Sequence, residues 1–191
     1  MPQEAPPQGL PACAAQAFAY ARTMLGSIAT FVPTMNRTRQ YWLMKNEPDE
    51  YSIDHALQAP DQRMPWTGVR NYQARNFMRD QMQADDGVLY WHSSCAEPGI
   101  HGIAQIAGNL RVDPTQFDPA DPYYDSKSSP DNPRWLMLDV QAIRKTRYVS
   151  IAELREHAAL QSMRVLQRGN RLSITPVTPQ EWDFITEVLL K

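Results

Sequence analysis

The amino-acid sequence predicts a mixed α/β fold, an α+β arrangement in which helices surround a small and strongly bent β-sheet or barrel. Short runs rich in branched and aromatic residues recur along the chain and are typical of strands. A few segments with marked N-terminal helix signals interrupt these runs. No internal repeat is visible, and the length is that of one ordinary domain with an extension.

The composition is that of a chain able to fold around a core. Of its 191 residues, 42% are hydrophobic and 21% are charged, so a buried core is expected and global disorder is not. The net charge is -2 and the pI about 6.1, whereas non-specific duplex binding usually accompanies a strongly basic balance. Any contact with nucleic acid would therefore depend on a local pocket.

Cysteine usage and hydropathy argue against several classes of protein. Cys13 and Cys95 lie far apart and no CxxC or His/Cys cluster occurs, so neither a zinc site nor a disulfide framework is indicated. This usage fits a reducing compartment, and we expect a cytoplasmic protein without metal or cofactor. The longest apolar stretches are far shorter than the roughly 20 residues that a membrane-spanning helix needs, so no membrane span is expected.

Residues 1–38 differ from the rest because they are rich in Pro, Gln and Ala and carry little charge. Only fragments of a signal-peptide pattern occur, around TMLGSIATFV, and Arg22 is the single basic residue ahead of it. We interpret 1–38 as a poorly ordered N-terminal extension, or as sequence upstream of a true start at Met35. Residues 39–191 are then the folded domain.

The first elements of the folded part alternate between strands and helices. YWLMK (41–45) predicts a strand, after which Ser52 caps a short helix, SIDHAL. Gly68 breaks the chain before a helix over 71–79, and VLYWH (88–92) predicts the next strand. GIHGIAQIAG (99–108) predicts another strand, with glycines where a sheet would bend. RWLMLDVQAIRKTRYV (134–149) predicts one long strand or a pair of strands.

Two later helix starts carry capping boxes. Ser150 with Glu153, and Thr178 with Glu181, match the pattern in which a hydroxyl and a glutamate satisfy free backbone amides reciprocally. The second helix places Trp182, Ile185 and Leu189 on one stripe, which predicts core packing.

Residues 113–133, DPTQFDPADPYYDSKSSPDNP, form a Pro-rich stretch without periodicity. A structureless loop of this length inside a compact domain is uncommon and often functional. Its aspartates 113, 118, 121 and 125 lack the Gly and closing Glu of a calcium loop, so we expect them to begin turns.

The densest run of planar and polar side chains is PWTGVRNYQARNF, residues 65–77. Trp42, Trp91, Trp135 and Trp182 lie in regular elements and are expected in the core, whereas Trp66 falls outside any predicted element. Trp66 either plugs the end of a barrel or forms a wall of a pocket for a flat ligand, and the sequence alone does not separate the two.

Three other polar groups are candidates for chemistry. His92 follows a strand, Lys45 to Pro48 end the first strand, and Arg168 to Ser173 combine two arginines with a glycine. For each, a structural role is the simpler alternative: a hydrogen-bonded histidine or a solvated turn. No GxSxG elbow, phosphate loop or GxGxxG occurs, so no strong catalytic signature is present.

Several stretches, in order, closely resemble the EVE domain family: YWLMKNEPDEYSID, PWTGVRNYQARNFMRD, PGIHGIAQI, FDPADPYYD, NPRWLMLDV and RGNRLSITPVTPQEW. The resemblance runs from about Tyr41 to the C-terminus. It implies a PUA-like fold, a small bent β-barrel with surrounding helices, and a pocket for a nucleobase, usually a modified one, in DNA or RNA. Many bacterial members are single-domain proteins similar to this one.

The family's motifs fall on identifiable positions. The lysine-serine-glutamate-proline pattern matches Lys45 to Pro48, with Asn46 in place of serine, and the tryptophan motif matches Trp66 to Tyr72, with Thr67 in place of aspartate. A third motif matches Trp91, His92 and Ser93, with Trp91 in place of a smaller aromatic residue. Since Asn46 and Thr67 flank the implied pocket, ligand preference is expected to be shifted.

These considerations give a predicted set of ligand-binding residues. Trp66 and Tyr72 would stack on the base, the amides and Ser93 would read its edge, and Arg70, Arg75 and the arginines near Asn170 would hold phosphates. The predicted site consists of Lys45, Asn46, Glu47, Trp66, Val69, Arg70, Asn71, Tyr72, Asn76, His92, Ser93, Arg168, Asn170 and Arg171.

The leading hypothesis is therefore a non-enzymatic domain that binds nucleic acid carrying a modified base. One alternative is a hydrolase acting on nucleic acid or a nucleotide, with His92 and either Glu47 or Lys45 as acid and base. Another is a protein-interaction adaptor that uses Tyr123 and Tyr124 of the Pro-rich loop.

Overall fold

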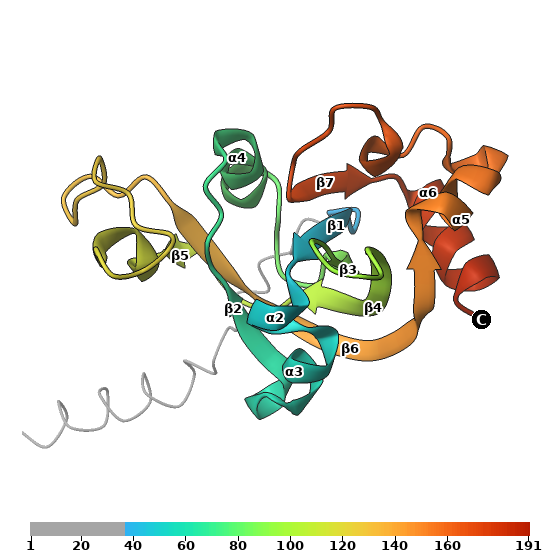
Figure 1. Cartoon of the computed structure of the whole chain (residues 1–191), viewed down its shortest axis with the longest axis horizontal. Coiled ribbons are helices and arrows are strands. Elements are labelled where there is room, and N and C mark those ends of the chain that lie inside the picture. The colour runs from blue at the N-terminus through green and yellow to red at the C-terminus, as the bar shows by residue number, and fades with distance from the viewer. Residues whose placement is uncertain (1–36) are drawn as a thin grey trace, which may run out of the picture. The chain divides into compact units, whose positions relative to one another are not determined.

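The computed structural model describes residues 37–191 (Figure 1). The predictions for the N-terminal extension therefore fall outside the described residues, apart from positions 37 and 38. Within the described part, seven strands form one strongly bent sheet in the order β2-β6-β4-β3-β1-β7, with β5 pairing with β6 outside this path. The strands are β1 (Tyr41–Asn46), β2 (Arg63–Trp66), β3 (Gly87–His92), β4 (Gly99–Ile106), β5 (Arg111–Val112), β6 (Leu136–Ser150) and β7 (Ile174–Val177).

The sheet is bent but not closed into a barrel. β1 and β3 are parallel, the other pairs are antiparallel, and β2 and β7 are the two edges of the strand path. Each edge strand has an exposed proline, Pro65 or Pro176, which has no N–H to offer another strand. The open edges therefore resist further pairing, and a gap is left between them.

The segment 134–149, predicted as one long strand or a pair of strands, forms the single strand β6. It is one 15-residue strand that curves along the sheet (Figure 1) and pairs with β4, β2 and β5. Its register with β4 shifts between Ile100 and Gly102, as expected where bulges bend a strand. A Cβ on Gly102 would lie 2.5 Å from Cγ1 of Ile53, so this glycine also admits the helix that covers the sheet.

Side chains alternate between two hydrophobic cores, one on each face of the sheet. On β1 and β3, Trp42 and Tyr90 belong to one core, whereas Leu43 and Trp91 belong to the other. All four tryptophans expected in the core are buried. The first core packs beneath α3 and α4, and the second packs against α5 and α6.

The helices begin largely where the sequence predicts. They are α2 (Pro48–Tyr51), α3 (Ile53–Gln58), α4 (Tyr72–Asp80), α5 (Ile151–Glu156) and α6 (Pro179–Phe184), with short 3₁₀ turns η1 (Pro60–Gln62), η2 (Pro114–Phe117), η3 (Ala158–Leu160) and η4 (Arg164–Leu166), and a π-helical turn η5 (Ile185–Leu189). The Thr178–Glu181 capping box is complete, and the Trp182 stripe is buried.

The capping box predicted at Ser150 is only half formed. The Ser150 hydroxyl accepts a hydrogen bond from the Glu153 backbone N–H at 3.0 Å, but the Glu153 carboxylate binds Arg147 instead of the cap amide. A nearby guanidinium offers two charge-assisted hydrogen bonds, which outweigh one backbone amide.

The Pro-rich segment 113–133 is irregular but internally ordered. Four of its aspartates, Asp113, Asp118, Asp121 and Asp125, each accept a hydrogen bond from the backbone N–H two residues later. The expectation that these residues begin turns is confirmed. Four regular elements of the described part were not predicted: the one-turn helix α2, the short proline-containing strand β2, the two-residue strand β5 and the edge strand β7.

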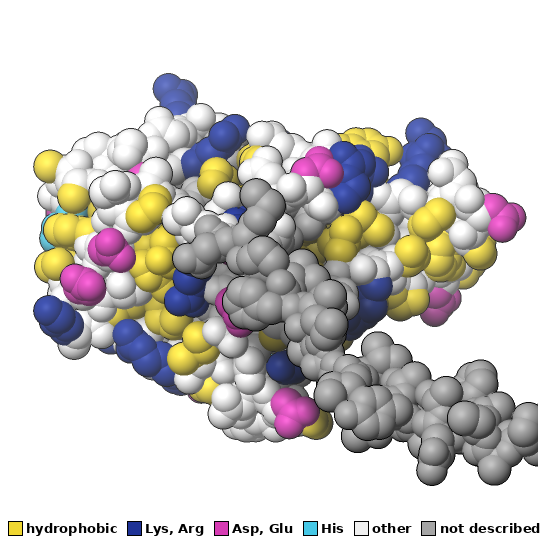
Figure 2. All heavy atoms as spheres, turned by 180° about the vertical axis from the view of Figure 1, so that it is seen from behind, with side chains coloured by type: hydrophobic (Ala, Val, Ile, Leu, Met, Phe, Trp, Pro, Cys, Tyr) yellow, Lys and Arg dark blue, Asp and Glu magenta, His cyan; other side chains and the backbone are white. Residues whose placement is uncertain are grey.

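Charges do not form a continuous basic stripe on the face shown in Figure 2. There, Lys and Arg side chains occur in several separate places among hydrophobic and acidic ones. Within residues 37–191, no helix has the length and apolar character needed to cross a membrane.

Candidate functional site

Two adjoining hollows contain most of the predicted site residues. We call the first the central pocket, of about 300 Å³. It is lined by Lys45, Asn46, Glu47, Glu50, Trp66, Thr67, Gly68, Val69, Ser93, Tyr123, Arg171 and Ser173. We call the second the arginine groove, of about 600 Å³. It is lined by Asn71, Gln73, Ser162, Arg164, Gln167, Arg168, Gly169, Asn170, Arg171 and Leu172.

The central pocket lies where the sheet fails to close. Trp66 ends the edge strand β2, Ser173 immediately precedes the edge strand β7, and Lys45 lies near the end of β1. The backbone N–H of Lys45 donates to the carbonyl of Ser173 at 2.8 Å, which ties two sides of the pocket together. The gap between the sheet edges thus becomes a hollow with walls fixed by backbone pairing.

Trp66 is both core and pocket lining. The sequence placed it outside any regular element, and this is wrong: Trp66 is the last residue of β2 and is only 3% exposed. Its ring meets Tyr90 edge to face at 5.4 Å between centroids. The two alternatives for Trp66, plug and wall, therefore do not exclude each other.

A second aromatic wall comes from the Pro-rich segment. Gly68 has a φ of 76°, and a Cβ at that position would lie 2.7 Å from Cζ of Tyr123. The Tyr123 hydroxyl donates to the two carboxylate oxygens of Glu50, at 2.6 and 2.8 Å. Gly68 thus lets the Tyr123 ring pack directly against the chain, and Glu50 holds the ring from the far side.

Arg70 and Asp113 anchor this wall. Arg70 donates to Asp113 at 2.8 Å, to the Tyr123 carbonyl at 2.6 Å and to Thr115 Oγ1 at 2.7 Å. Asp113 is fully buried and also accepts from the Gly68 N–H at 3.0 Å. Burial alone would raise the pKa of Asp113, but the hydrogen bonds from Arg70, Thr115 and Gly68 outweigh it and lower the pKa.

The polar groups of the central pocket have both charges. Burial lowers the pKa of Lys45, whose Nζ lies 5.8 Å from the centroid of the Trp91 ring. Among the described residues, the Glu47 carboxylate has no hydrogen bond or ion pair, although its backbone N–H donates to Asn46 Oδ1 at 2.9 Å. The pocket therefore offers a cationic donor and a carboxylate acceptor at the rim of an aromatic hollow.

His92 lies outside both hollows. Its ring is buried, its Nε2 accepts a hydrogen bond from the Ile53 backbone N–H at 3.1 Å, and it stacks on His101 at 4.1 Å. Burial, with a smaller contribution from His101, lowers its pKa to about 4. The imidazole is consequently neutral near pH 7 and already engaged by the backbone.

Tyr72, Asn76 and Arg70 also lie outside both linings. Tyr72 stacks on Trp135 at 4.8 Å, and Asn76 Oδ1 accepts from Arg75 Nη2 at 2.7 Å. Arg75, proposed from the sequence as a phosphate ligand, further donates to the Arg134 carbonyl at 3.0 Å. These side chains connect α4 to the segment before β6.

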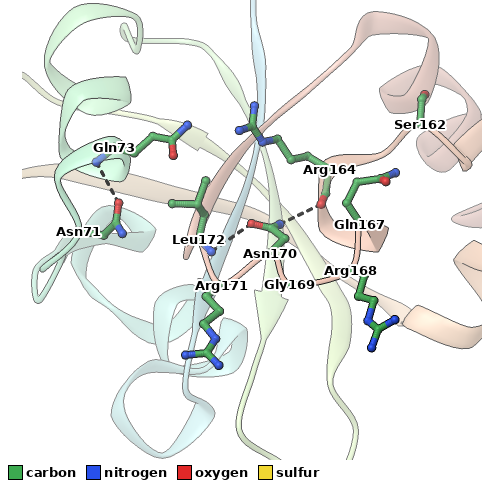
Figure 3. Close-up of a pocket in the computed structure, with 10 residues that line it drawn as sticks. All are labelled: Asn71, Gln73, Ser162, Arg164, Gln167, Arg168, Gly169, Asn170, Arg171 and Leu172. Carbon is green, nitrogen blue, oxygen red and sulfur yellow. Dashed lines mark hydrogen bonds between the residues drawn. The ribbon is translucent and has the colours of Figure 1, made fainter.

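The arginine groove is formed by the loop before β7 on one side and the start of α4 on the other (Figure 3). Asn170 closes this loop, since its Nδ2 donates to the Arg164 carbonyl at 2.9 Å and its Oδ1 accepts from Leu172 N at 3.1 Å. Asn71 caps α4 by accepting from Gln73 N at 2.9 Å and Ala74 N at 3.1 Å.

The structure divides the predicted site into three groups. Seven residues line the central pocket: Lys45, Asn46, Glu47, Trp66, Val69, Ser93 and Arg171. Asn71, Arg168, Asn170 and Arg171 line the arginine groove. The remaining four, Arg70, Tyr72, Asn76 and His92, line neither.

The predicted ligand-binding set omits Glu50, Tyr123 and Ser173 of the pocket and Arg164 of the groove. From the sequence, Ser173 is singled out only as the end of the polar cluster Arg168 to Ser173, and Tyr123 only as a protein-interaction residue. Tyr123 lies within FDPADPYYD, so the family resemblance carried a signal for it. No comparable local signal marked Arg164. No group of His, Cys, Asp and Glu in the described part of the chain is arranged to hold a metal ion.

Comparison with known proteins places the chain beside a recognised family. Residues 40–188 match the family model described as EVE domain. Thymocyte nuclear protein 1 of Gallus gallus is 41% identical over 163 residues, 76% of this chain and 66% of that protein. The chain thus spans about two thirds of the chicken protein's length. The Rattus norvegicus protein is 39% identical over 179 residues, 84% of this chain and 78% of the relative.

Solved structures agree with this likeness. A protein from Pseudomonas syringae matches with a TM-score of 0.74 and 40% identity, covering 78% of this chain and 98% of its own. Human THYN1 protein in complex with 5-methylcytosine-containing DNA matches with a TM-score of 0.74 and 39% identity, covering 80% of this chain and 98% of its own.

Proposed function

Since the chain belongs to the EVE domain family, we propose that it is a binding domain for DNA that carries a modified base, and that the central pocket receives that base. The coarser part of this proposal draws on the human relative, whose structure is a complex with 5-methylcytosine-containing DNA. The assignment of particular residues to the base is based on the geometry of the pocket.

The observation that carries the proposal is the combination of a flat wall with an unpaired acceptor. Tyr123 and the buried Trp66 both line the pocket, and stacking on aromatic rings contributes roughly 1–3 kcal/mol per base. A volume of about 300 Å³ is at the small end of ligand sites and suits one base rather than a larger ligand.

The edge of the base would be recognised by charged and polar groups. A carboxylate accepts well from the exocyclic amine of cytosine, and the Glu47 carboxylate is the acidic group of the pocket without a partner among the described residues. Lys45 supplies a donor for a ring nitrogen or carbonyl. An amino-bearing base such as cytosine is therefore favoured over thymine or uracil.

The pocket supports binding rather than hydrolysis. The hydrolase alternative needs His92 beside Glu47 or Lys45, but His92 does not line the pocket and its Nε2 is occupied by the Ile53 amide. A catalytic general base must lie within hydrogen-bond reach of the proton that it removes. The His92 ring has no such position relative to a ligand in the central pocket, because it lies outside the pocket lining.

Equilibrium binding to DNA with one unpaired 5-methylcytosine, compared with cytosine at that position, tests the proposal. Burial of the methyl group alone should favour 5-methylcytosine by about fourfold. Glu47→Gln should weaken binding of both DNAs by about tenfold or more, because a charge-assisted hydrogen bond is lost. Glu187→Gln, which removes the same charge at an exposed position outside both hollows, should leave affinity unchanged.

Equal affinity of Glu47→Gln and wild type for the methylated DNA would remove Glu47 from the site. Equal affinity of wild type for DNA with and without the modification would overturn the reading of the central pocket as a modified-base site.

A further inference from the structure

We propose that the arginine groove binds the sugar-phosphate backbone of the strand that carries the base, with successive phosphates leading away from the central pocket. This inference rests on the proposed function, because it takes the strand's starting point to be a base held in that pocket. It adds a second binding site, with a different chemistry, to the first.

The first observation is that three guanidinium groups of the groove have no intramolecular partner among the described residues. Arg164, Arg168 and Arg171 all line the groove, and within residues 37–191 no hydrogen bond or ion pair engages their side-chain nitrogens. By contrast, Arg70 is committed to Asp113 and Arg111 to Asp139. Three unpaired planar donors around one hollow favour an anionic ligand that comes from outside the chain.

The second observation is the absence of opposing charge. No Asp or Glu occurs among the residues that line the groove, whereas the central pocket contains two glutamates. The remaining polar lining consists of amides and a hydroxyl: Asn71, Gln73, Ser162, Gln167 and Asn170. The groove lining thus carries three arginines and no acid. Outside this lining, the Glu181 carboxylate shares a neighbouring hollow with Arg164 and accepts from the Ser162 hydroxyl at 2.9 Å.

The third observation is continuity with the central pocket. Arg171 lines both hollows, and Ser173, two residues later, lies in the pocket wall that is bonded to Lys45. A strand whose base occupies the pocket would carry its neighbouring phosphates toward the groove, because every nucleotide adds one phosphate and the two hollows share Arg171.

The fourth observation is the direction of the guanidinium groups. In Figure 3, Arg164 extends to the opposite side of the loop from Arg168 and Arg171, so the three do not converge on one point. This arrangement suits several phosphates along a strand better than a single phosphate or carboxylate. A single anion would require the donors to share one centre.

The loop that presents these arginines is held in shape before any ligand arrives. Asn170 bridges Arg164 and Leu172, and the Gln167 side chain donates to the Gln161 carbonyl at 3.0 Å. Gly169 allows the tight turn with a φ of 81°, and no atom lies within 4 Å of the position that a Cβ would occupy there. A preformed loop with open space in front of it favours binding because little order has to be imposed.

The salt dependence of binding tests the inference. Two short single-stranded DNAs are used, one with a single 5-methylcytosine and one with cytosine in its place, with wild type, Arg164→Gln and Arg168→Gln. Each substitution should reduce the slope of log affinity against log salt by about 0.7, the value expected for loss of one phosphate contact on a single strand. The ratio of the two affinities should stay constant, since phosphates carry no base identity.

Arg144→Gln is the matched control, because Arg144 is an exposed arginine of β6 outside both hollows. It should leave the slope unchanged. Neutral methylphosphonate linkages next to the modified base should lower the slope for wild type and have a smaller effect on Arg168→Gln, since the contact is already missing. Arg171 is left intact because it lines both hollows.

Slopes for Arg164→Gln and Arg168→Gln equal to the slope for Arg144→Gln would overturn the groove proposal, even if wild type still prefers the modified base. Reduced slopes in a protein that shows no preference for the modified base would support phosphate binding in the groove, but would overturn the base pocket and with it the path of the strand away from that pocket. No binding of either oligonucleotide by wild type would overturn both.

Discussion

Gly68 in the central pocket and Gly169 in the arginine groove have nearly the same positive φ, 76° and 81°, but very different surroundings. A Cβ on Gly68 would collide with the Tyr123 ring at 2.7 Å, whereas a Cβ on Gly169 would meet nothing within 4 Å. The wall of the central pocket at Gly68 is therefore tightly packed. The groove at Gly169 is formed by a surface loop that is held by hydrogen bonds within the loop.

The two regions also differ in charge and hence in what they can recognise. The central pocket combines Lys45 and Arg171 with Glu47 and Glu50, an arrangement that can distinguish donors from acceptors. The groove offers arginines without acids, which attract any phosphate. Base preference should therefore depend on the pocket, and salt-sensitive affinity on the groove.

The largest expected difference between the regions is in stability. Trp66→Ala should destabilise the protein by about 3–5 kcal/mol, because it removes a buried ring that packs on Tyr90. Arg168→Ala, at an exposed groove position, should change stability by less than about 0.5 kcal/mol. Urea denaturation measures both. Similar stabilities of the two variants would contradict the distinction between packed pocket and surface groove.

The paired glycines give the next largest contrast. Gly68→Ala should cost about 2–4 kcal/mol, because left-handed strain adds to a collision with the Tyr123 ring. Gly169→Ala should cost only about 1–2 kcal/mol, from strain alone. Thermal denaturation of the two variants, recorded side by side, gives the comparison. A Gly169→Ala variant as unstable as Gly68→Ala would mean that the groove loop is packed too.

Lowering the pH should destabilise the packed sheet next to the pocket through His92, whereas no titrating group of this kind lines the groove. The folded state keeps the pKa of His92 at about 4, below the ordinary 6.5, so the unfolded chain takes up a proton first as pH falls. Stability should fall between about pH 6.5 and pH 4, by up to about 3 kcal/mol. Denaturation curves across this range measure the loss, and His92→Gln should flatten it.

The carboxylate of Asp113 also makes the protein less stable as pH falls, but in a lower pH range than His92. Its pKa is lowered in the folded state, so its contribution is present above the unfolded value of about 3.9 and is lost as pH falls through the folded value. A stability curve that stays level from pH 6.5 to pH 4 in wild type would contradict the burial of a neutral His92.

The smallest expected effect concerns the wall that Tyr123 forms. Tyr123→Phe keeps the ring but removes the hydroxyl that donates to Glu50, so stability should fall by about 1 kcal/mol, as for one partly exposed hydrogen bond. Binding of 5-methylcytosine DNA should weaken by less than about tenfold, with the salt slope unchanged, because no phosphate contact is altered. An altered slope would place Tyr123 against the backbone of the strand instead of the base.

Much of the fold could be predicted from local sequence. Strong strand runs, the Ser52 and Thr178 caps and the Trp182 stripe all act over a few residues, and the structure confirms them. The strand β2 was not predicted, because four residues that include a proline give a weak strand signal. Its pairing with β6 stabilises it in the folded protein. That omission also misplaced Trp66.

The site was harder to predict because it depends on contacts between distant residues. Arg70 and His92 have side-chain chemistry suited to a ligand, but Asp113 and the Ile53 amide, each about 40 residues away, occupy them. Conversely, Tyr123 and Glu50 have little local signal, and only the tertiary fold brings them together across 73 residues. Residue type indicated the chemistry, but long-range partners decided which side chains remain free.

The most direct test of the central claim is the ratio of affinities for two DNAs that differ by one methyl group on cytosine, measured for wild type, Tyr123→Ala and Arg168→Gln. If the base is recognised in the central pocket and the phosphates in the groove, Tyr123→Ala brings the ratio close to one, while Arg168→Gln lowers both affinities by the same factor. A ratio that survives in Tyr123→Ala but collapses in Arg168→Gln would contradict this division between the two regions.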